Sequence, residues 1–349
     1  MANFVMPTNT RAPEWSKAKN DAVVVDPDLV VLGAVDVGRG PIGDIAADGT
    51  TLVVTNSGDN SVSVIDADTL TVESTVTVTG EPFATAAIDD RAYVSTASAS
   101  YDSVSVVDTD AKAVIASYPL AFSVTGVAVS PDGKRVFAGR SGRDQADIAV
   151  IDITSDRVGT IDLAGGAGIN VDAVRVSPSG KRVYAATSDV RGSRLVVVDA
   201  ETARAIGAVM IGSPIRDLAL SPDGSIAYVL SCDPVHGGIV NVIDLTTHAI
   251  TGTAGIGGSP MQMTLSADGA RAYIVDHDDV AVLCTVTNEV VDAITVGAQP
   301  SCVAVSPTGD RLYVADYAGV VTALSVDSQF IATDVLAVPD LRELRPATA

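Results

Sequence analysis

The sequence has few of the residues that usually carry redox or metal chemistry. It is 349 residues long but holds only 3 cysteines and 3 histidines. Cys232, Cys284 and Cys302 stand in separate strand contexts, and neither a C-x-x-C nor a C-x-x-C-H motif occurs. Scattered cysteines in odd number exclude a disulfide framework, and the missing motifs exclude a redox pair and covalently attached haem. We therefore expect small buried thiols and no tightly bound cofactor.

Patterns for a metal site, a nucleophile or a nucleotide are also missing. The histidines fall in turns or loops, and no Gly-x-Ser-x-Gly elbow occurs. The glycines of 165–168 are not followed by a helical pattern, so they do not form a phosphate loop. The run 276–279 could hold a cation, but a solvated turn is the favoured interpretation. Calcium is less firmly excluded than transition metals, because scattered aspartates and carbonyls can bind it without a motif.

Positive charge is scarce as well. Lysine and arginine number 22 against 43 acidic residues, a net charge of −21, which disfavours nucleic acid as a partner. The mean hydropathy is +0.34, yet no apolar run is long enough to span a bilayer. Residues 1–22 lack the apolar core of a signal peptide. We expect a cytoplasmic monomer, with export or association with the cell envelope as the alternative if a leader has been removed.

What the sequence does contain is a unit of about 40 residues that recurs seven times. One marker is a turn residue near the start of each unit, and the other is an aspartate after a Val-Ile or Val-Val pair. The turn markers are Gly49, Asp90, Gly133, Gly180, Gly224, Gly269 and Gly309. The aspartates are Asp66, Asp108, Asp152, Asp199 and Asp244, with Cys284 and Ser325 in their place in the last two units. Because the turn markers and the aspartate markers recur together along the sequence, the repeat is real.

Each unit has four short apolar stretches of period two, separated by polar turns, which is the pattern of a β-propeller blade. The sequence thus predicts an all-β fold, a seven-bladed β-propeller with four antiparallel strands per blade. The seventh unit lacks its fourth strand, and Leu29–Gly38 matches the missing piece, so the N-terminal strand should close the ring. The predicted organisation is a flexible segment over 1–22, the propeller over 23–327 and a tail over 328–349.

Several segments resemble the YVTN family of β-propeller repeats. They are Val53–Asp66, Ser130–Phe137, Ser221–Val229 and Ser306–Val314, and the likeness extends over roughly residues 29–326. The resemblance implies the propeller fold. It implies no single activity, because that family includes surface-layer-like, redox-associated and uncharacterised bacterial proteins.

The first strand of each blade lines the central channel of a propeller. By alternation, the residues seven and five positions before the turn glycine should face that channel. Most are small, and the exceptions are Arg175, Asp217, Gln262 and Cys302, with Arg216 one residue nearer the mouth. A guanidinium there could bind a carboxylate or phosphate. The alternative is an Arg175–Asp217 ion pair between neighbouring blades that satisfies both charges.

Segments between the second and third strands are longer in the middle units, over 95–102, 139–147, 187–194 and 231–238. Insertions in repeat proteins often mark the binding face. These segments carry Arg140, Arg143, Arg191, Arg194 and His236. We expect this face to bind a partner, although surface loops with local Arg–Asp pairs are the simpler interpretation.

Two functions from different classes fit these observations. The first is a non-enzymatic propeller that binds an unidentified protein or small ligand through the long-loop face and the channel mouth. The alternative is an enzyme of the hydrolase or lactonase kind with its site at the channel mouth. Haem-linked redox work would need axial ligands that these histidines do not offer.

Overall fold

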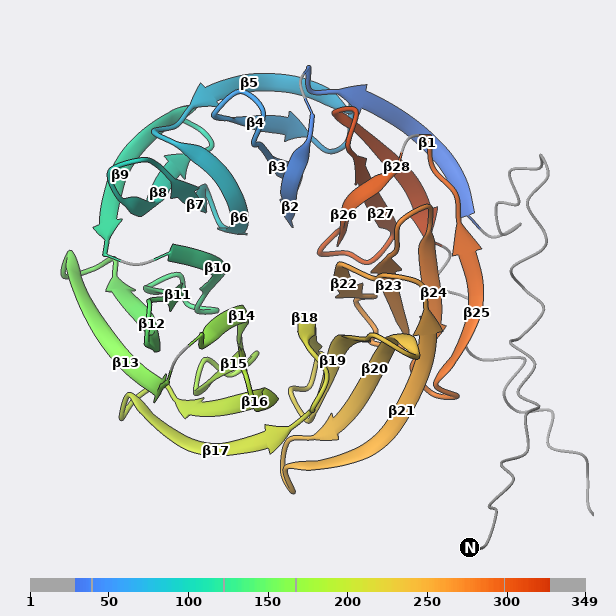
Figure 1. Cartoon of the computed structure of the whole chain (residues 1–349). Coiled ribbons are helices and arrows are strands. Elements are labelled where there is room, and N and C mark those ends of the chain that lie inside the picture. The colour runs from blue at the N-terminus through green and yellow to red at the C-terminus, as the bar shows by residue number, and fades with distance from the viewer. Residues whose placement is uncertain (1–28, 39, 122, 167, 298, 327–349) are drawn as a thin grey trace, which may run out of the picture.

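The computed structural model describes residues 29–38, 40–121, 123–166, 168–297 and 299–326. These residues form seven four-stranded antiparallel sheets, arranged as blades around a central channel (Figure 1). The described chain contains no helix, and thus no helix that could cross a membrane. The all-β, seven-bladed fold predicted from the repeat is confirmed.

In blades 1 to 6 the strands follow in sequence order from the channel to the outer wall, and in blade 7 the outer strand is β1. Blades 1 to 3 are β2 (Ile42–Asp48), β3 (Thr51–Asn56), β4 (Ser61–Asp66), β5 (Thr71–Thr77); β6 (Glu81–Ile88), β7 (Arg91–Ala97), β8 (Asp102–Asp108), β9 (Ala113–Leu120); and β10 (Ser123–Val129), β11 (Arg135–Ser141), β12 (Gln145–Asp152), β13 (Arg157–Gly165). Blades 4 and 5 are β14 (Asn170–Val176), β15 (Arg182–Asp189), β16 (Gly192–Asp199), β17 (Arg204–Met210); and β18 (Ile215–Leu220), β19 (Ile226–Asp233), β20 (Gly237–Asp244), β21 (Ala249–Gly257). Blades 6 and 7 are β22 (Gln262–Leu265), β23 (Arg271–Val275), β24 (Val280–Cys284), β25 (Glu289–Ile294); and β26 (Pro300–Val305), β27 (Arg311–Asp316), β28 (Val320–Val326) with β1 (Leu29–Asp36).

The N-terminal strand completes blade 7. β1 pairs antiparallel with β28, from Leu29 opposite Val326 to Asp36 opposite Val320. It therefore covers the backbone edge that β28 would otherwise expose, as the missing fourth strand predicted. The predicted segments 1–22 and 328–349 lie outside the described residues.

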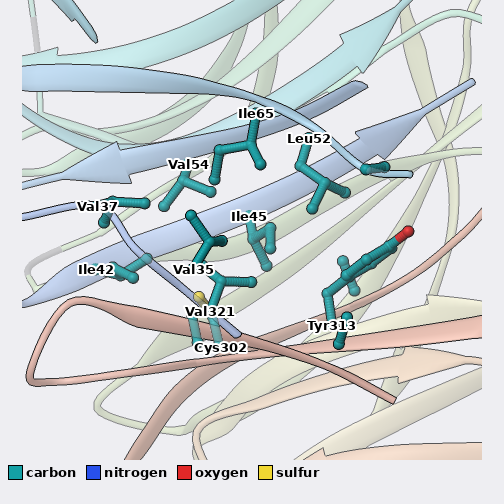
Figure 2. Close-up of a cluster of buried hydrophobic side chains, with 14 residues drawn as sticks. Val35, Val37, Ile42, Ile45, Leu52, Val54, Ile65, Cys302, Tyr313 and Val321 are labelled. Carbon is teal, nitrogen blue, oxygen red and sulfur yellow. The ribbon is translucent and has the colours of Figure 1, made fainter. Parts of the chain in front are cut away.

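The hydrophobic core is divided into clusters between neighbouring blades. Figure 2 shows the cluster between blades 7 and 1, where Ile42 and Leu52 of blade 1 meet Tyr313 and Val321 of blade 7. The aromatic residue of the second strand is buried in blades 2 to 7. Each fully buried Val, Ile or Leu contributes roughly 1.5–3 kcal/mol, so packing between blades holds the ring together.

The ring has two unlike faces. We call the loop face the side with the turns between second and third strands and the connections between blades. Backbone hydrogen bonds tie these segments together, such as Cys232 N to Pro214 O at 2.9 Å and Tyr317 N to Gln299 O at 3.0 Å. The opposite side, the turn face, carries the Ser-Pro-Asp-Gly turns and the turns between third and fourth strands.

The long loops expected in the middle blades are mostly strand. β15 and β16 stay paired as far as Asp189 and Gly192, so only Val190 and Arg191 form the tip. β19 and β20 likewise pair out to Asp233 and Gly237. The prediction of loops was wrong here because the extra residues satisfy their backbone groups by extending the hairpins.

Candidate functional site at the channel mouth

A β-bulge near the start of the inner strand shapes the channel mouth. In six blades the register between first and second strands shifts by one residue at this point. A bulge leaves one residue unpaired and re-aims its side chain. In blade 6, Met261 directly precedes β22 at the same level. Seven residues thus ring the mouth of a cavity of about 980 Å³: Gly43, Phe83, Thr125, Asp172, Arg216, Met261 and Ser301.

In blades 5 and 7 the residue after the bulge is buried between neighbouring blades. Asp217 is only 4% exposed and Cys302 only 1%. Cys302 belongs to the cluster between blades 7 and 1, does not line the cavity, and burial raises the pKa of its thiol. Alternation along the strand predicted both residues in the channel. Asp217 does line the cavity, as do Arg175 and Gln262, whereas Cys302 does not, because the bulge adds one residue to the strand and places the Cys302 side chain between blades.

Asp217 connects three blades. Its Oδ1 accepts hydrogen bonds from Arg175 Nη2 and from Leu218 N, both at 2.7 Å. Its Oδ2 accepts one from Met263 N of blade 6 at 2.9 Å. Burial raises the pKa of Asp217, and the Arg175 guanidinium opposes that rise. The ion pair between neighbouring blades, considered above as the alternative to a ligand site, is present.

Gln262 connects a second set of blades. Its Oε1 accepts a hydrogen bond from Val303 N at 2.8 Å, and its Nε2 donates to Asp44 Oδ1 at 2.8 Å. Asp44 Oδ2 in turn accepts one from Thr85 N at 2.9 Å. Burial raises the pKa of Asp44 to about 6, against hydrogen bonds from the backbone of Thr85 and Ile45.

Asp44 escaped the sequence analysis, although it occupies the same place as Asp217. In blade 1 the first and second strands join by a shorter turn, with Asp48 paired to Thr51. Asp44 therefore lies five positions before Gly49, whereas Asp217 lies seven before Gly224; both are offsets that predict a channel-facing residue, so the signal was present in the sequence. Counting from the apolar residues of the second strand would have aligned Asp44 with Asp217 and Gln262.

Arg216 and Asp172 are the charged residues among the seven that ring the mouth. Arg216 is exposed and lines the cavity, and it makes no hydrogen bond or ion pair to any described residue. Asp172 Oδ2 is buried without a hydrogen-bond partner in the described chain. Burial raises the pKa of Asp172 to about 6, while a hydrogen bond with Ser188 and the charge of Arg216 oppose the rise.

Three exposed apolar side chains share the mouth with these charges. Phe83 comes from the bulge of β6, Met261 precedes β22, and Tyr317 lies in the turn between β27 and β28. Tyr317 Oη lies 3.6 Å from Met261 Sδ. The mouth therefore offers the guanidinium of Arg216, the carboxylate of Asp172 and an apolar wall, and Glu81 also lines the cavity.

Two of the four arginines predicted in loops lie at the hairpin of blade 4. Arg194 Nη2 is 2.7 Å and Arg191 Nη2 is 3.3 Å from the same Asp189 oxygen. The backbone amide of Arg191, more than the guanidiniums, lowers the pKa of Asp189. Arg143 is exposed in the turn between β11 and β12. Arg140 is instead buried in β11, 2.6 Å from Asp147.

His236 lies at the tip of the β19–β20 hairpin, not in the channel. Its Nδ1 is 2.9 Å from Asp233 Oδ1. The backbone amides of His236 and Val235 lower the pKa of Asp233 to about 2. The structure therefore separates His236 from Arg175, Asp217 and Gln262. Within the described ranges no three His, Cys, Asp or Glu side chains gather as a metal site.

Comparison with known proteins places the chain beside other propellers. No family model matches it. It is 40% identical to a seven-bladed β-propeller protein of Mycobacterium tuberculosis over 260 residues, 65% of this chain and 64% of that protein. It is 56% identical to one of Mycolicibacterium smegmatis over 190 residues, 54% of this chain and 52% of that protein. The matches thus span between half and two thirds of these relatives.

A solved structure shares the fold as well. A chain of the hydrazine synthase of Kuenenia stuttgartiensis superposes with a TM-score of 0.73 and 25% identity, over 84% of this chain and 98% of that one. The chain described here is therefore a seven-bladed β-propeller protein that is similar in sequence to two mycobacterial proteins of that description.

Proposed function

We propose that this protein is a non-enzymatic propeller that binds a protein or ligand through its loop face and channel mouth. The observation that carries the proposal is the use of the inner polar residues. Asp217 and Gln262 direct both polar atoms of their side chains to other blades, and Arg175 pairs with Asp217. A hydrolase would need these groups to meet a substrate.

The loop face has the exposed side chains that an interface uses. Val190 and Val235 are 87% and 84% exposed at the tips of two hairpins, and Tyr101 is exposed in blade 2. Arg191 stands beside Val190 and is also exposed. Aromatic, apolar and arginine side chains are the residues that anchor protein–protein contacts.

Charge is unevenly distributed over the loop face. In the described chain, its basic residues all belong to blades 3 to 5: Arg140, Arg143, Arg191, Arg194 and Arg216. Blades 6, 7, 1 and 2 present acidic residues there, among them Asp276, Asp36, Asp59 and Glu81. Such a division orients a partner that carries the complementary charges.

The structural neighbour, a hydrazine synthase, is an enzyme by its name, but the structural similarity between the two chains supports only a shared fold. One fold hosts many functions, so chemistry has to be argued from the site. The cavity lining includes no histidine, and its deeper carboxylates, Asp44 and Asp217, are held by backbone amides. These contacts favour a binding role over general acid–base catalysis.

Affinity capture with matched variants tests the proposal. The protein is immobilised, and captured proteins and metabolites are identified by mass spectrometry. We expect Arg191→Ala, Arg194→Ala and Arg216→Ala together to abolish capture of a partner that the native chain enriches, while melting changes little. Loss of an arginine anchor typically costs a complex about 2 kcal/mol or more.

The control changes three exposed basic residues of the turn face, Arg157, Lys181 and Arg204, to alanine. This variant alters the net charge equally but should keep the partner. Loss of the partner from the turn-face variant alone would contradict the proposal, because the binding surface would then lie on the other side of the ring.

A further inference from the structure

The charged side chains of the cavity differ in whether they can bind a ligand. Arg175, Asp44 and Asp217 are engaged with other blades through hydrogen bonds of 2.7 to 2.9 Å. Arg216 lines the same cavity, is exposed, and has no hydrogen-bonding partner among the described residues. An exposed guanidinium is a fork of donors that matches a carboxylate.

Asp172 is the complementary group on the neighbouring blade. It occupies the bulge of β14, as Arg216 occupies the bulge of β18, and the two inner strands pack side by side. The two charges interact, since Arg216 lowers the pKa of Asp172 against the effect of burial. Asp172 Oδ2 has no hydrogen-bond partner in the described chain. A ligand with a donor could supply one.

The overall charge of the cavity selects between kinds of ligand. Its lining holds two guanidiniums, of Arg175 and Arg216, and four carboxylates, of Asp44, Glu81, Asp172 and Asp217. A plain anion would meet a net negative cavity, and a plain cation would be repelled by Arg216 at the entrance. A molecule with both charges satisfies Arg216 and Asp172 together.

The remaining wall of the mouth is apolar. Met261 lies on the blade next to Arg216, and Tyr317 contacts it. Phe83 stands on β6, across the channel from β18 (Figure 1). All three side chains are exposed to the cavity, whose volume of about 980 Å³ accommodates a small organic molecule.

We propose that the channel mouth binds a small zwitterion of the amino-acid type with an apolar side chain. The carboxylate meets Arg216, the ammonium group meets Asp172, and the side chain rests against Phe83, Met261 and Tyr317. This inference rests on the proposed function of the mouth as a binding site and names the class of its ligand.

Isothermal titration calorimetry on the full chain tests the inference with defined probes. L-Phenylalanine and L-leucine should bind saturably. 3-Phenylpropanoate lacks the ammonium group, L-phenylalaninamide lacks the carboxylate, and glycine lacks the side chain. Each of these three should bind about tenfold more weakly or worse, because each leaves one part of the mouth unmatched.

Variants assign the binding to the mouth. Arg216→Gln and Asp172→Asn should each weaken L-phenylalanine about tenfold or more without loss of folding, and Arg204→Gln on the turn face should not. Thermal melting of each variant checks that it is folded. The inference is overturned if neither amino acid binds at millimolar concentration, if 3-phenylpropanoate binds as well as L-phenylalanine, or if Arg216→Gln keeps the native affinity.

The two proposals can fail separately. Capture of a protein partner that depends on Arg191 and Arg194 would persist if only the zwitterion site is wrong. Amino-acid binding that depends on Arg216 and Asp172 would persist if only the protein interface is wrong.

Discussion

Three polar side chains of the inner strands serve as ties between blades. Asp44, Asp217 and Gln262 each accept a hydrogen bond from a backbone amide of the next blade, at Thr85, Met263 and Val303 respectively. The inner strand has a hydrogen-bonding neighbour strand on one side only, and a buried amide without an acceptor would be costly. Polar residues that resemble a catalytic ring in the sequence therefore have a structural use.

The buried carboxyl of Asp44 should make stability depend on pH in the mildly acidic range. Burial raises its pKa from 3.8 to about 6, so the folded protein binds more protons than the unfolded chain between these values. Stability attributable to Asp44 therefore increases as the pH falls from 7 to 5, by roughly 1 kcal/mol. Urea unfolding at both pH values should show a smaller increase for Asp44→Asn than for the native chain.

Asp110→Asn provides the control, because Asp110 is an exposed aspartate in the turn of blade 2. It should keep the native dependence on pH. The range stops at pH 5 because turn aspartates with a lowered pKa, such as Asp66 and Asp223, lose their stabilising hydrogen bonds in stronger acid. An identical slope for Asp44→Asn and the native chain would contradict the prediction.

At the residue scale, the sequence predicted which side chains interact better than it predicted where each side chain lies. Arg175 and Asp217 could be matched because they are oppositely charged residues among small ones, and the structure joins them at 2.7 Å. Cys302 could not be placed, since a thiol fits a channel wall and a core equally well, and it is in the core. Asp172 was not predicted, because the sequence alone does not show that a bulge leaves it without a partner on the second strand.

At the scale of elements, the strands were predictable and their irregularities were not. Period-two apolar stretches indicate where strands run, but a bulge is a property of two paired strands and leaves no pattern in one. The hairpins of blades 4 and 5 show the same limit. Their polar residues look like loops, whereas backbone pairing extends to Asp189 and Asp233.

Packing between blades can be tested at a glycine. A Cβ on Gly139 of β11 would lie 2.6 Å from Val171 Cγ1 and 2.8 Å from Val174 Cγ2 of β14. Gly139→Ala should therefore push blades 3 and 4 apart and destabilise the fold by about 1–3 kcal/mol. Denaturant unfolding measures this loss.

Gly159→Ala in the outer strand β13 is the matched control. The nearest atom to its added Cβ is Val150 O at 3.9 Å, an ordinary contact. The change should be neutral or slightly stabilising, because alanine restricts the unfolded chain. Equal effects of the two substitutions would show that blade packing does not limit residue size at Gly139.

At the scale of the whole molecule, repetition made the fold readable and the function obscure. Seven units with one apolar pattern can bury their faces only against each other, which indicates a closed ring. The residues that give the mouth its individuality, such as Phe83, Asp172, Arg216 and Met261, do not repeat. A repeat therefore specifies the scaffold, and the site depends on the positions where units differ.

Closure of the ring by the first strand is the prediction that concerns the whole molecule. β1 supplies the outer edge of blade 7 and buries Leu29 and Val35 in clusters on either side of that blade. Removal of residues 1–36 should expose the edge of β28, lower the melting temperature strongly and promote aggregation through the free edge. Removal of residues 1–22, which precede the repeat pattern, should leave melting unchanged. Thermal unfolding and light scattering of both truncations, beside the full chain, measure the two effects. If the shorter truncation destabilises as much as the longer one, pairing of β1 with β28 is not what closes the ring.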